Sequence, residues 1–189
     1  MMFDQLSFTQ LMQRFEQLSP PGMAGKSLMW PEEREAILNA IPADRPCRVV
    51  EIGTYDGCTA RWLGEQRPLA TIVSVDNASA PEHTHLALEN LRLRPNVRLF
   101  VGDSRQLAAV VPPGIWDLVV VDADHEYEPV LTDLEMAYVL CRPGGVVFAH
   151  DYGLKPYPGV QRAVDQACKL GLFRHTGTTH WLAHLEPLE

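Results

Sequence analysis

The stretch that decides the fold of this chain is Val49-Val50-Glu51-Ile52-Gly53-Thr54-Tyr55-Asp56-Gly57. Its apolar run ends at a carboxylate, and a turn with two glycines then leads into a helical pattern that begins at Thr59. A glycine turn between a strand and a helix lets backbone approach a ligand closely, because no side chain stands in the way. The stretch therefore predicts a ligand site of the nucleotide-binding type at this turn.

Length and composition describe one globular domain. The chain has 189 residues, of which 46% are hydrophobic and 21% are charged, and this is enough to build a hydrophobic core. The net charge of −8 argues against nucleic acid as a partner, since binding to a phosphate backbone requires clustered Lys and Arg. The four cysteines have no CxxC spacing, so we expect reduced thiols.

The sequence also bears on location. The chain does not open with a basic segment followed by an apolar one, and no apolar run approaches the length of a membrane span. We therefore expect a cytoplasmic protein with no membrane partner.

From residue 47 onward, apolar runs alternate with helical patterns. The runs are almost entirely Val, Ile and Leu, as in a parallel sheet that is covered on both faces. This alternation predicts an α/β protein with a doubly wound, Rossmann-like core over residues 46–189. The expected strands are 48–52, 71–76, 97–101, 118–122 and 145–150, and the expected helices are 59–66, 81–93, 104–110, 129–140 and 159–169.

The two ends of the chain add smaller elements. Amphipathic spacing predicts helices over residues 4–18 and 31–41, within an N-terminal helical appendage that covers residues 1–45 of the single domain 1–189. The first helix is a candidate dimer element, so a homo-oligomer is one expected state. Near the C-terminus, Gly177-Thr178-Thr179 separates two short strands, 172–176 and 180–185, and predicts a hairpin at an antiparallel edge.

Acidic residues follow each of the five main strands. In a sheet of this kind, ligands bind beyond the carboxyl ends of the strands, so these side chains are expected to share one rim. The segments are Glu51, Asp76, Gly102-Asp103, Asp122-Ala123-Asp124-His125 and His150-Asp151-Tyr152.

The glycine loop distinguishes between two kinds of cofactor. A nicotinamide dinucleotide site uses G-x-G-x-x-G, but Tyr55 stands where the second glycine would be, and Asp56 would place negative charge near the phosphates. An acidic loop instead suits a cationic cofactor without phosphate, such as S-adenosylmethionine. Asp76 fits an acid that accepts ribose hydroxyls, which both cofactor classes use.

These motifs resemble those of the class I S-adenosylmethionine-dependent methyltransferases over residues 27–152. Residues 51–59 are similar to motif I, Val75-Asp76 to the ribose-binding motif, and Gly102-Asp103-Ser104 to the adenine-contacting motif. Residues 122–127, with Arg142-Pro143-Gly144-Gly145 and His150-Asp151-Tyr152, resemble methyltransferase domain family 24, related in layout to catechol O-methyltransferase and to bacterial sugar and antibiotic O-methyltransferases. The resemblance implies a seven-stranded sheet in the order 3-2-1-4-5-7-6, with the last strand antiparallel, plus N-terminal helices.

The resemblance also implies which residues bind the cofactor. Glu51 and Gly53 would contact the methionine part, Asp76 the ribose, and Asp103 with the Ser104 amide the adenine edge. The full implied set is Met29, Glu51, Gly53, Tyr55, Asp76, Asn77, Asp103, Ser104 and Asp122.

Methyl transfer is an in-line displacement, so the enzyme aligns the two reactants and removes a proton from the acceptor. The resemblance implies metal ligands at Asp122, His150 and Asp151. Magnesium prefers oxygen ligands, whereas imidazole suits manganese and similar divalent ions. His150 is therefore either a ligand for such an ion or, without a metal, a general base or a substrate contact. The proton acceptor is expected among Asp124, His125 and His150.

Structural alternatives accompany these roles. Asp124 could cap the following helix, and His125 could bond backbone in its loop. Asp133 is expected on the solvated face of that helix.

The sequence thus predicts an S-adenosylmethionine-dependent methyltransferase that methylates a hydroxyl of a small molecule (a sugar, a phenol or a secondary metabolite). One form of this hypothesis includes a divalent metal ion that assists the reaction. A binding module that has lost the chemistry and a nicotinamide-dependent oxidoreductase are the alternatives.

Overall fold

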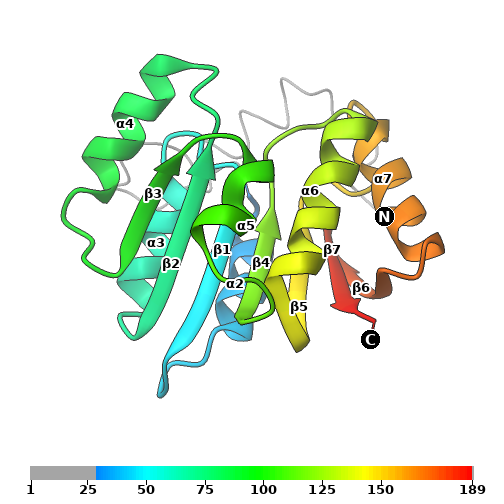
Figure 1. Cartoon of the computed structure of the whole chain (residues 1–189), viewed down its shortest axis with the longest axis horizontal. Helices are drawn as coiled ribbons and strands as arrows, with labels where there is room; N and C mark the ends of the chain where they lie inside the picture. Colours follow the sequence, from blue (N-terminus) through cyan, green and yellow to red (C-terminus); the bar gives the residue numbers. More distant parts are fainter. Residues whose placement is uncertain (1–28, 189) are drawn as a thin grey trace.

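The computed structural model describes residues 29–188, and within that range the chain forms a seven-stranded sheet (Figure 1). The strand order is β3-β2-β1-β4-β5-β7-β6, and β7 is antiparallel to both of its neighbours. This order confirms the predicted Rossmann-like α/β fold. The strands are β1 (Cys47–Ile52), β2 (Ala70–Asp76), β3 (Val97–Val101), β4 (Trp116–Val121), β5 (Cys141–Ala149), β6 (Phe173–Thr179) and β7 (Leu182–Pro187).

Helices cover both faces of the sheet. In Figure 1, α5 and α6 lie in front of the sheet and α3 lies behind it. The predicted helix over residues 4–18 lies outside the described residues. The helices are α2 (Pro31–Ala40), α3 (Cys58–Gln66), α4 (Pro81–Leu91), the 3-10 helix η1 (Ser104–Gln106), α5 (Leu107–Val110), α6 (Tyr127–Leu140) and α7 (Pro158–Lys169).

Neighbouring residues of the central strands belong to two separate cores. Val49 of β1 and Leu118 of β4 pack with α2 and α3, whereas Val50 and Val119 pack with α6 and α7. Successive side chains of a strand point to opposite faces, so a strand that is apolar at every position must be buried on both. This is why the central strands read as continuous runs of Val, Ile and Leu.

The hairpin near the C-terminus turns later than predicted. Strand β6 continues through Thr179, which pairs with Leu182, and the chain reverses at His180 and Trp181 instead of at 177–179. His180 has φ +51°, a left-handed conformation that glycine more often adopts, so the turn left no glycine signal in the sequence. Gly177 instead lies where the register of the β6–β7 pair shifts.

The parallel strands β1 to β5 end at one edge of the sheet, and Gly53 brings two of these ends into contact. Gly53 has φ +104°, and a Cβ at this position would lie 2.1 Å from the carbonyl oxygen of Asp122. The amide of Asp122 in turn donates to the Ile52 carbonyl at 2.8 Å. The loop after β1 therefore packs directly against the end of β4, which only glycine permits.

Among the described residues, no helix has both the length and the apolar character that a membrane crossing would require.

Candidate active site

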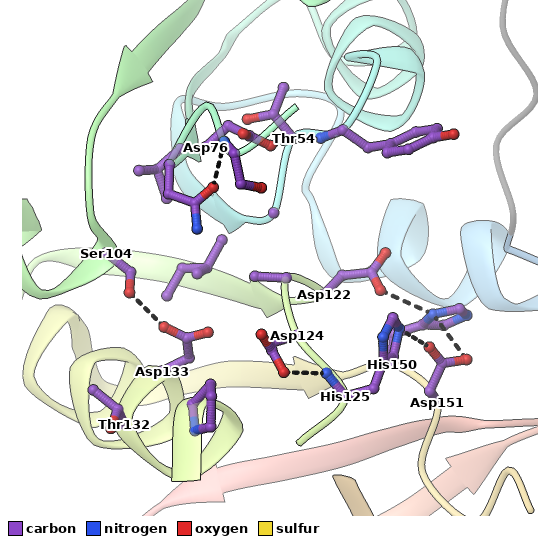
Figure 2. A pocket seen from close by; sticks show the side chains of 18 of the residues that line it. Thr54, Asp76, Ser104, Asp122, Asp124, His125, Thr132, Asp133, His150 and Asp151 are labelled. Atoms are coloured by element: carbon purple, nitrogen blue, oxygen red, sulfur yellow. Dashed lines mark hydrogen bonds and ion pairs between the residues drawn. The ribbon is translucent and has the colours of Figure 1, made fainter. Parts of the chain in front are cut away.

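A cavity of about 650 Å³ lies at the carboxyl edge of the sheet, lined by the loops after β1, β2, β3, β4 and β5 and by one side of α6. Figure 2 shows the side chains that face it. The predicted residues that line the cavity are Gly53, Tyr55, Asp76, Asn77, Asp103, Ser104, Asp122, Asp124, His125, His150 and Asp151. The acidic residues that were predicted at the ends of the five main strands, except Glu51, therefore line one continuous cavity.

Asp76 holds the loop after β1 in place. Its Oδ2 accepts the amide of Tyr55 at 3.0 Å, and its Oδ1 accepts the amide of Ala78 at 2.9 Å. Each carboxylate oxygen can accept a further bond, so both remain available to a diol. Tyr55 itself has φ +52° and places its half-exposed ring 4.0 Å from the ring of His83, between centroids.

Glu51 lies beneath this loop and does not line the cavity. Its carboxylate accepts a short hydrogen bond from Ser74 Oγ, which is itself 2.7 Å from Thr54 Oγ1. Burial raises the pKa of Glu51 to about 8, although the bond from Ser74 opposes the shift. Met29 is likewise packed in the core beside α2 and does not line the cavity. These two residues are the members of the predicted cofactor set that the structure does not bring to the site.

At the end of β3, Asp103 and Ser104 make different contacts. Asp103 accepts hydrogen bonds from the Arg105 side chain, which lower the pKa of its carboxyl to about 2. Ser104 Oγ donates to Asp133 Oδ1 at 2.5 Å, from η1 to α6 (Figure 2).

The prediction that Asp133 lies on a solvated face is wrong. Asp133 is 5% exposed and lines the cavity, and burial raises its pKa to about 6. It shares the buried stripe of α6 with Val130 and Ala137, at the three- and four-residue spacing of one helix face. That spacing is the signal by which the sequence could have placed it.

Four titratable side chains meet at the far end of the cavity (Figure 2). His150 Nδ1 lies 3.0 Å from Asp122 Oδ1 and 3.5 Å from Asp151 Oδ1. Asp151 Oδ2 lies 2.9 Å from His125 Nε2. The two histidines and two aspartates thus form one continuous chain of polar contacts across the ends of β4 and β5.

The charges in this cluster shift each other's pKa values. Burial alone would lower the pKa of His150, but the carboxylates of Asp122 and Asp151 outweigh it and raise the pKa well above its usual value. Burial would raise the pKa of Asp151, but the two histidines hold it below its usual range. The hydrogen bond to Asp151 raises the pKa of His125. Opposite charges therefore stabilise each other at Asp151 and the two histidines, whereas burial raises the pKa of Asp122 in spite of the neighbouring His150.

The loop that follows β4 is organised by its own side chains. Asp124 Oδ1 accepts the amides of His125 at 2.7 Å and Glu126 at 2.8 Å, just before α6 begins. Asp124 therefore does not cap α6, whose N-cap is Glu126 and has no side-chain cap hydrogen bond; it closes a turn in the preceding loop and uses one of its two carboxylate oxygens to do so. The His125 ring stacks on Tyr157 at 3.9 Å between centroids.

The sequence of the site matches a known family. A family model described as a methyltransferase domain, family 24, covers residues 50–152, more than half of the chain. The chain belongs to this family. This confirms the resemblance to the class I S-adenosylmethionine-dependent methyltransferases and disfavours the nicotinamide alternative.

Individual relatives of this methyltransferase domain share part of its length or its fold. Over 104 residues it is 31% identical to catechol O-methyltransferase of Mycobacterium tuberculosis, covering 53% of this chain and 46% of the relative. The chain spans about half the length of the curated relatives that it matches.

Two solved structures are similar in fold. Fibrillarin of Aeropyrum pernix, crystallised with natively bound S-adenosyl-L-methionine, has TM-score 0.61 and 18% identity, over 82% of this chain and 76% of that one. The TDP-rhamnose 3′-O-methyltransferase of calicheamicin biosynthesis has TM-score 0.65 and 18% identity, over 94% and 93% of the two chains. At these identities the likeness shows a shared fold.

The methyltransferase domain offers one candidate metal site among its described residues, made of Asp122, His150 and Asp151, whose ligand atoms lie within 4.8 Å of one another. Ligands bonded at about 2.1 Å at right angles to each other would be about 3 Å apart. The separations of 3.0 and 3.5 Å between His150 Nδ1 and the two carboxylates are close to this value. One imidazole and two carboxylates suit manganese or a similar ion better than magnesium.

One residue of the site was missed by the sequence interpretation. Glu33 of α2 is fully buried, and its Oε2 lies 3.1 Å from His150 Nε2. The same side chain accepts the Trp30 amide at 2.8 Å, which is the half of a capping box that the third helical residue supplies. A glutamate at the third position of a helix is typical of a cap, so nothing in the local sequence indicated a contact with β5.

Proposed function

We propose that the chain is an S-adenosylmethionine-dependent O-methyltransferase that acts on a hydroxyl of a small molecule, with the assistance of a divalent metal ion. The observation that carries the proposal is that one cavity joins two sites. The motif I loop and Asp76 line one part, and the acid–histidine cluster around His150 lines another. Two similar proteins are named as O-methyltransferases, of catechol and of TDP-rhamnose, which supports a hydroxyl as the acceptor.

The donor part of the cavity suits a cationic cofactor. Asp76 presents carboxylate oxygens to a ribose, and Ser104 with Asp133 forms a polar wall beyond it. Asp56, which accepts the Cys58 amide at 3.0 Å, adds a second acidic side chain to this part of the cavity. A sulfonium and an ammonium group are attracted to such a surface, whereas a diphosphate is repelled.

The acceptor part has to align a hydroxyl oxygen with the methyl carbon and take its proton. We assign the proton to Asp124, because only its Oδ1 is engaged by the two loop amides and the side chain faces the cavity. The oxygen then bonds to the methyl carbon while the carbon–sulfur bond breaks, and its electron pair stays on sulfur. His125, held by Asp151 and stacked on Tyr157, forms the adjacent wall.

Asp122, His150 and Asp151 would hold the divalent ion. When bound, the ion would lower the pKa of an acceptor hydroxyl and help to position it. A carboxylate would then be a strong enough base for the acceptor proton. Without the ion, His150 has both ring nitrogens within hydrogen-bond distance of carboxylates, which leaves it poorly placed as a base.

The experiment measures transfer of a labelled methyl group from S-adenosylmethionine to a panel of phenols and sugars, with manganese or with excess EDTA. Asp124→Asn keeps an oxygen for the two loop amides but removes the base, so kcat should fall about 100-fold or more while S-adenosylhomocysteine still binds. Glu135→Gln, on the exposed side of α6, is the control.

Each part of the proposal can fail separately. Full turnover in excess EDTA would remove the metal from the mechanism. Binding of the cofactor product without turnover of any hydroxyl compound would favour the binding-module alternative, in which the fold is kept and the chemistry is lost.

A further inference from the structure

Glu33 is an acidic side chain that is fully buried in the core, whereas most of the other carboxylates within residues 29–188 lie on the surface or at the cavity. Burial of a carboxylate is costly unless hydrogen bonds replace its hydration. Three N–H groups surround this one. The Trp30 amide lies 2.8 Å from Oε2, the Trp181 amide 2.9 Å from Oε1, and His150 Nε2 3.1 Å from Oε2.

Two of these three donors are backbone groups, and they fix the direction of the carboxylate. The Trp30 amide belongs to the start of α2, and the Trp181 amide belongs to the turn between β6 and β7. Neither amide can rotate away, so Glu33 is held between the two segments with Oε2 directed at the end of β5. The two amides therefore hold the Glu33 carboxylate in one orientation, as a residue that positions another side chain requires.

The contact fixes the orientation of the His150 ring from its Nε2 side. A carboxylate only accepts hydrogen bonds, so the nitrogen beside Glu33 must carry a proton. Nδ1 faces Asp122 and Asp151 across 3.0 and 3.5 Å, and by the same argument it carries a proton unless a metal ion takes the proton's place. A histidine whose other N–H is held by a carboxylate is the usual arrangement of a metal-ligating imidazole, because that bond fixes both the ring orientation and the tautomer.

We propose that Glu33 is a positioning residue of the active centre, which holds the Nε2 proton of His150 and so directs Nδ1 toward Asp122 and Asp151. This role rests on the proposed methyl-transfer function, since it matters only if His150 serves the acceptor site. It makes α2, an element outside the Rossmann-like core, part of the catalytic structure. The contact spans 117 positions of the sequence.

The test compares Glu33→Gln with Glu35→Gln in the full chain. Glutamine has the size of glutamate and keeps one acceptor oxygen, but it loses the charge and places an N–H₂ group against a donor. Glu35 is exposed on the same helix and serves as the matched control. We expect Glu33→Gln to weaken manganese binding, followed by calorimetry, and to lower kcat, each by about 10- to 100-fold. The affinity for S-adenosylhomocysteine should change less than about twofold, because the donor loop does not touch Glu33.

A second readout does not depend on activity. In nitrogen-15 NMR of histidine-labelled protein, His150 should show a protonated Nε2 in the wild type, and its ring signals should shift in Glu33→Gln but not in Glu35→Gln. Wild-type protein with an unprotonated Nε2 on His150 would overturn the proposal even if the variant failed to fold. A Glu33→Gln variant that matches the control in manganese affinity, kcat and ring signals would overturn it as well.

The two failures are distinguishable. If the wild type transfers no methyl group, the proposed function fails, and the NMR comparison still decides whether Glu33 orients His150. If the wild type is active and Glu33→Gln is equally active, the function stands and the role of Glu33 is structural.

Discussion

Replacing Gly53 by alanine tests how the cofactor loop is built. Gly53 has φ +104°, and an added Cβ would lie 2.1 Å from the carbonyl oxygen of Asp122 and 2.7 Å from Cα of Ala123. All of these neighbouring atoms are backbone, so no side chain can rotate aside. Real Cβ atoms essentially never approach another heavy atom within 3.0 Å, so the end of β4 or the loop itself must move by about 1 Å.

The energetic cost has two parts. A non-glycine residue in this region of φ costs about 1–3 kcal/mol. The movement also strains the hydrogen bonds from the Asp122 amide to Ile52 and from the Gly53 amide to Val75, at 2.8 and 2.9 Å, which contribute about 1 kcal/mol each. The free energy of unfolding should thus fall by about 3–5 kcal/mol.

The assay is urea unfolding of Gly53→Ala beside Gly171→Ala, followed by circular dichroism. Gly171 has φ +78°, and a Cβ there would meet no atom within 4 Å, so this variant carries the conformational cost without the collision. It should lose only about 1–2 kcal/mol. Gly53→Ala should also lose binding of S-adenosylhomocysteine, whereas Gly171→Ala should keep it. Equal stability of the two variants, with binding retained in both, would refute the account of the loop.

Two further predictions concern α6 and α7. Burial raises the pKa of Asp133 to about 6, so the folded state favours the neutral carboxyl more than the unfolded chain does. The stability that Asp133 contributes is therefore fully present below about pH 4 and is lost as the pH rises through 6. In urea unfolding at pH 8, the free energy of unfolding of Asp133→Asn should therefore exceed that of the wild type by about 2–3 kcal/mol. This difference should shrink toward pH 5. A difference that stays constant with pH would contradict the presence of a buried acid that titrates in this range. At Gly159, a Cβ would lie 2.4 Å from the His125 carbonyl oxygen. Gly159→Ala should displace the loop that carries Asp124 and His125, so kcat should fall while S-adenosylhomocysteine binds as before. An unchanged kcat would show that contact with α7 does not determine the position of this loop.

Much of the fold could be predicted because its physical signals are local. The central strands are apolar at every position, since both faces of the sheet are covered, and each ends near an acid. The order of the strands came from the resemblance to a family and not from these runs, which carry no information on neighbours. The residues at the strand ends, such as Asp76, Asp122 and Asp151, were predicted correctly to line one site because parallel strands end at one edge.

The errors arose where the deciding contact is distant in the sequence or hidden by a local pattern. Glu33 fits a helix cap, and its contact with His150 forms only when α2 folds against the residue that follows β5. Asp133 is a charged residue on a buried stripe, where Ser104 compensates part of the cost of burial. His180 turns the chain in a conformation that usually signals glycine.

The central claim, that the loop after β1 binds the methyl donor, is tested most directly by calorimetry with S-adenosylhomocysteine. We predict binding in the micromolar range to the wild type and no detectable binding to Asp76→Ala, because Asp76 both holds the Tyr55 amide and presents its oxygens to the ribose. Absence of binding to the folded wild type would contradict the claim, and so would equal affinity in the two proteins.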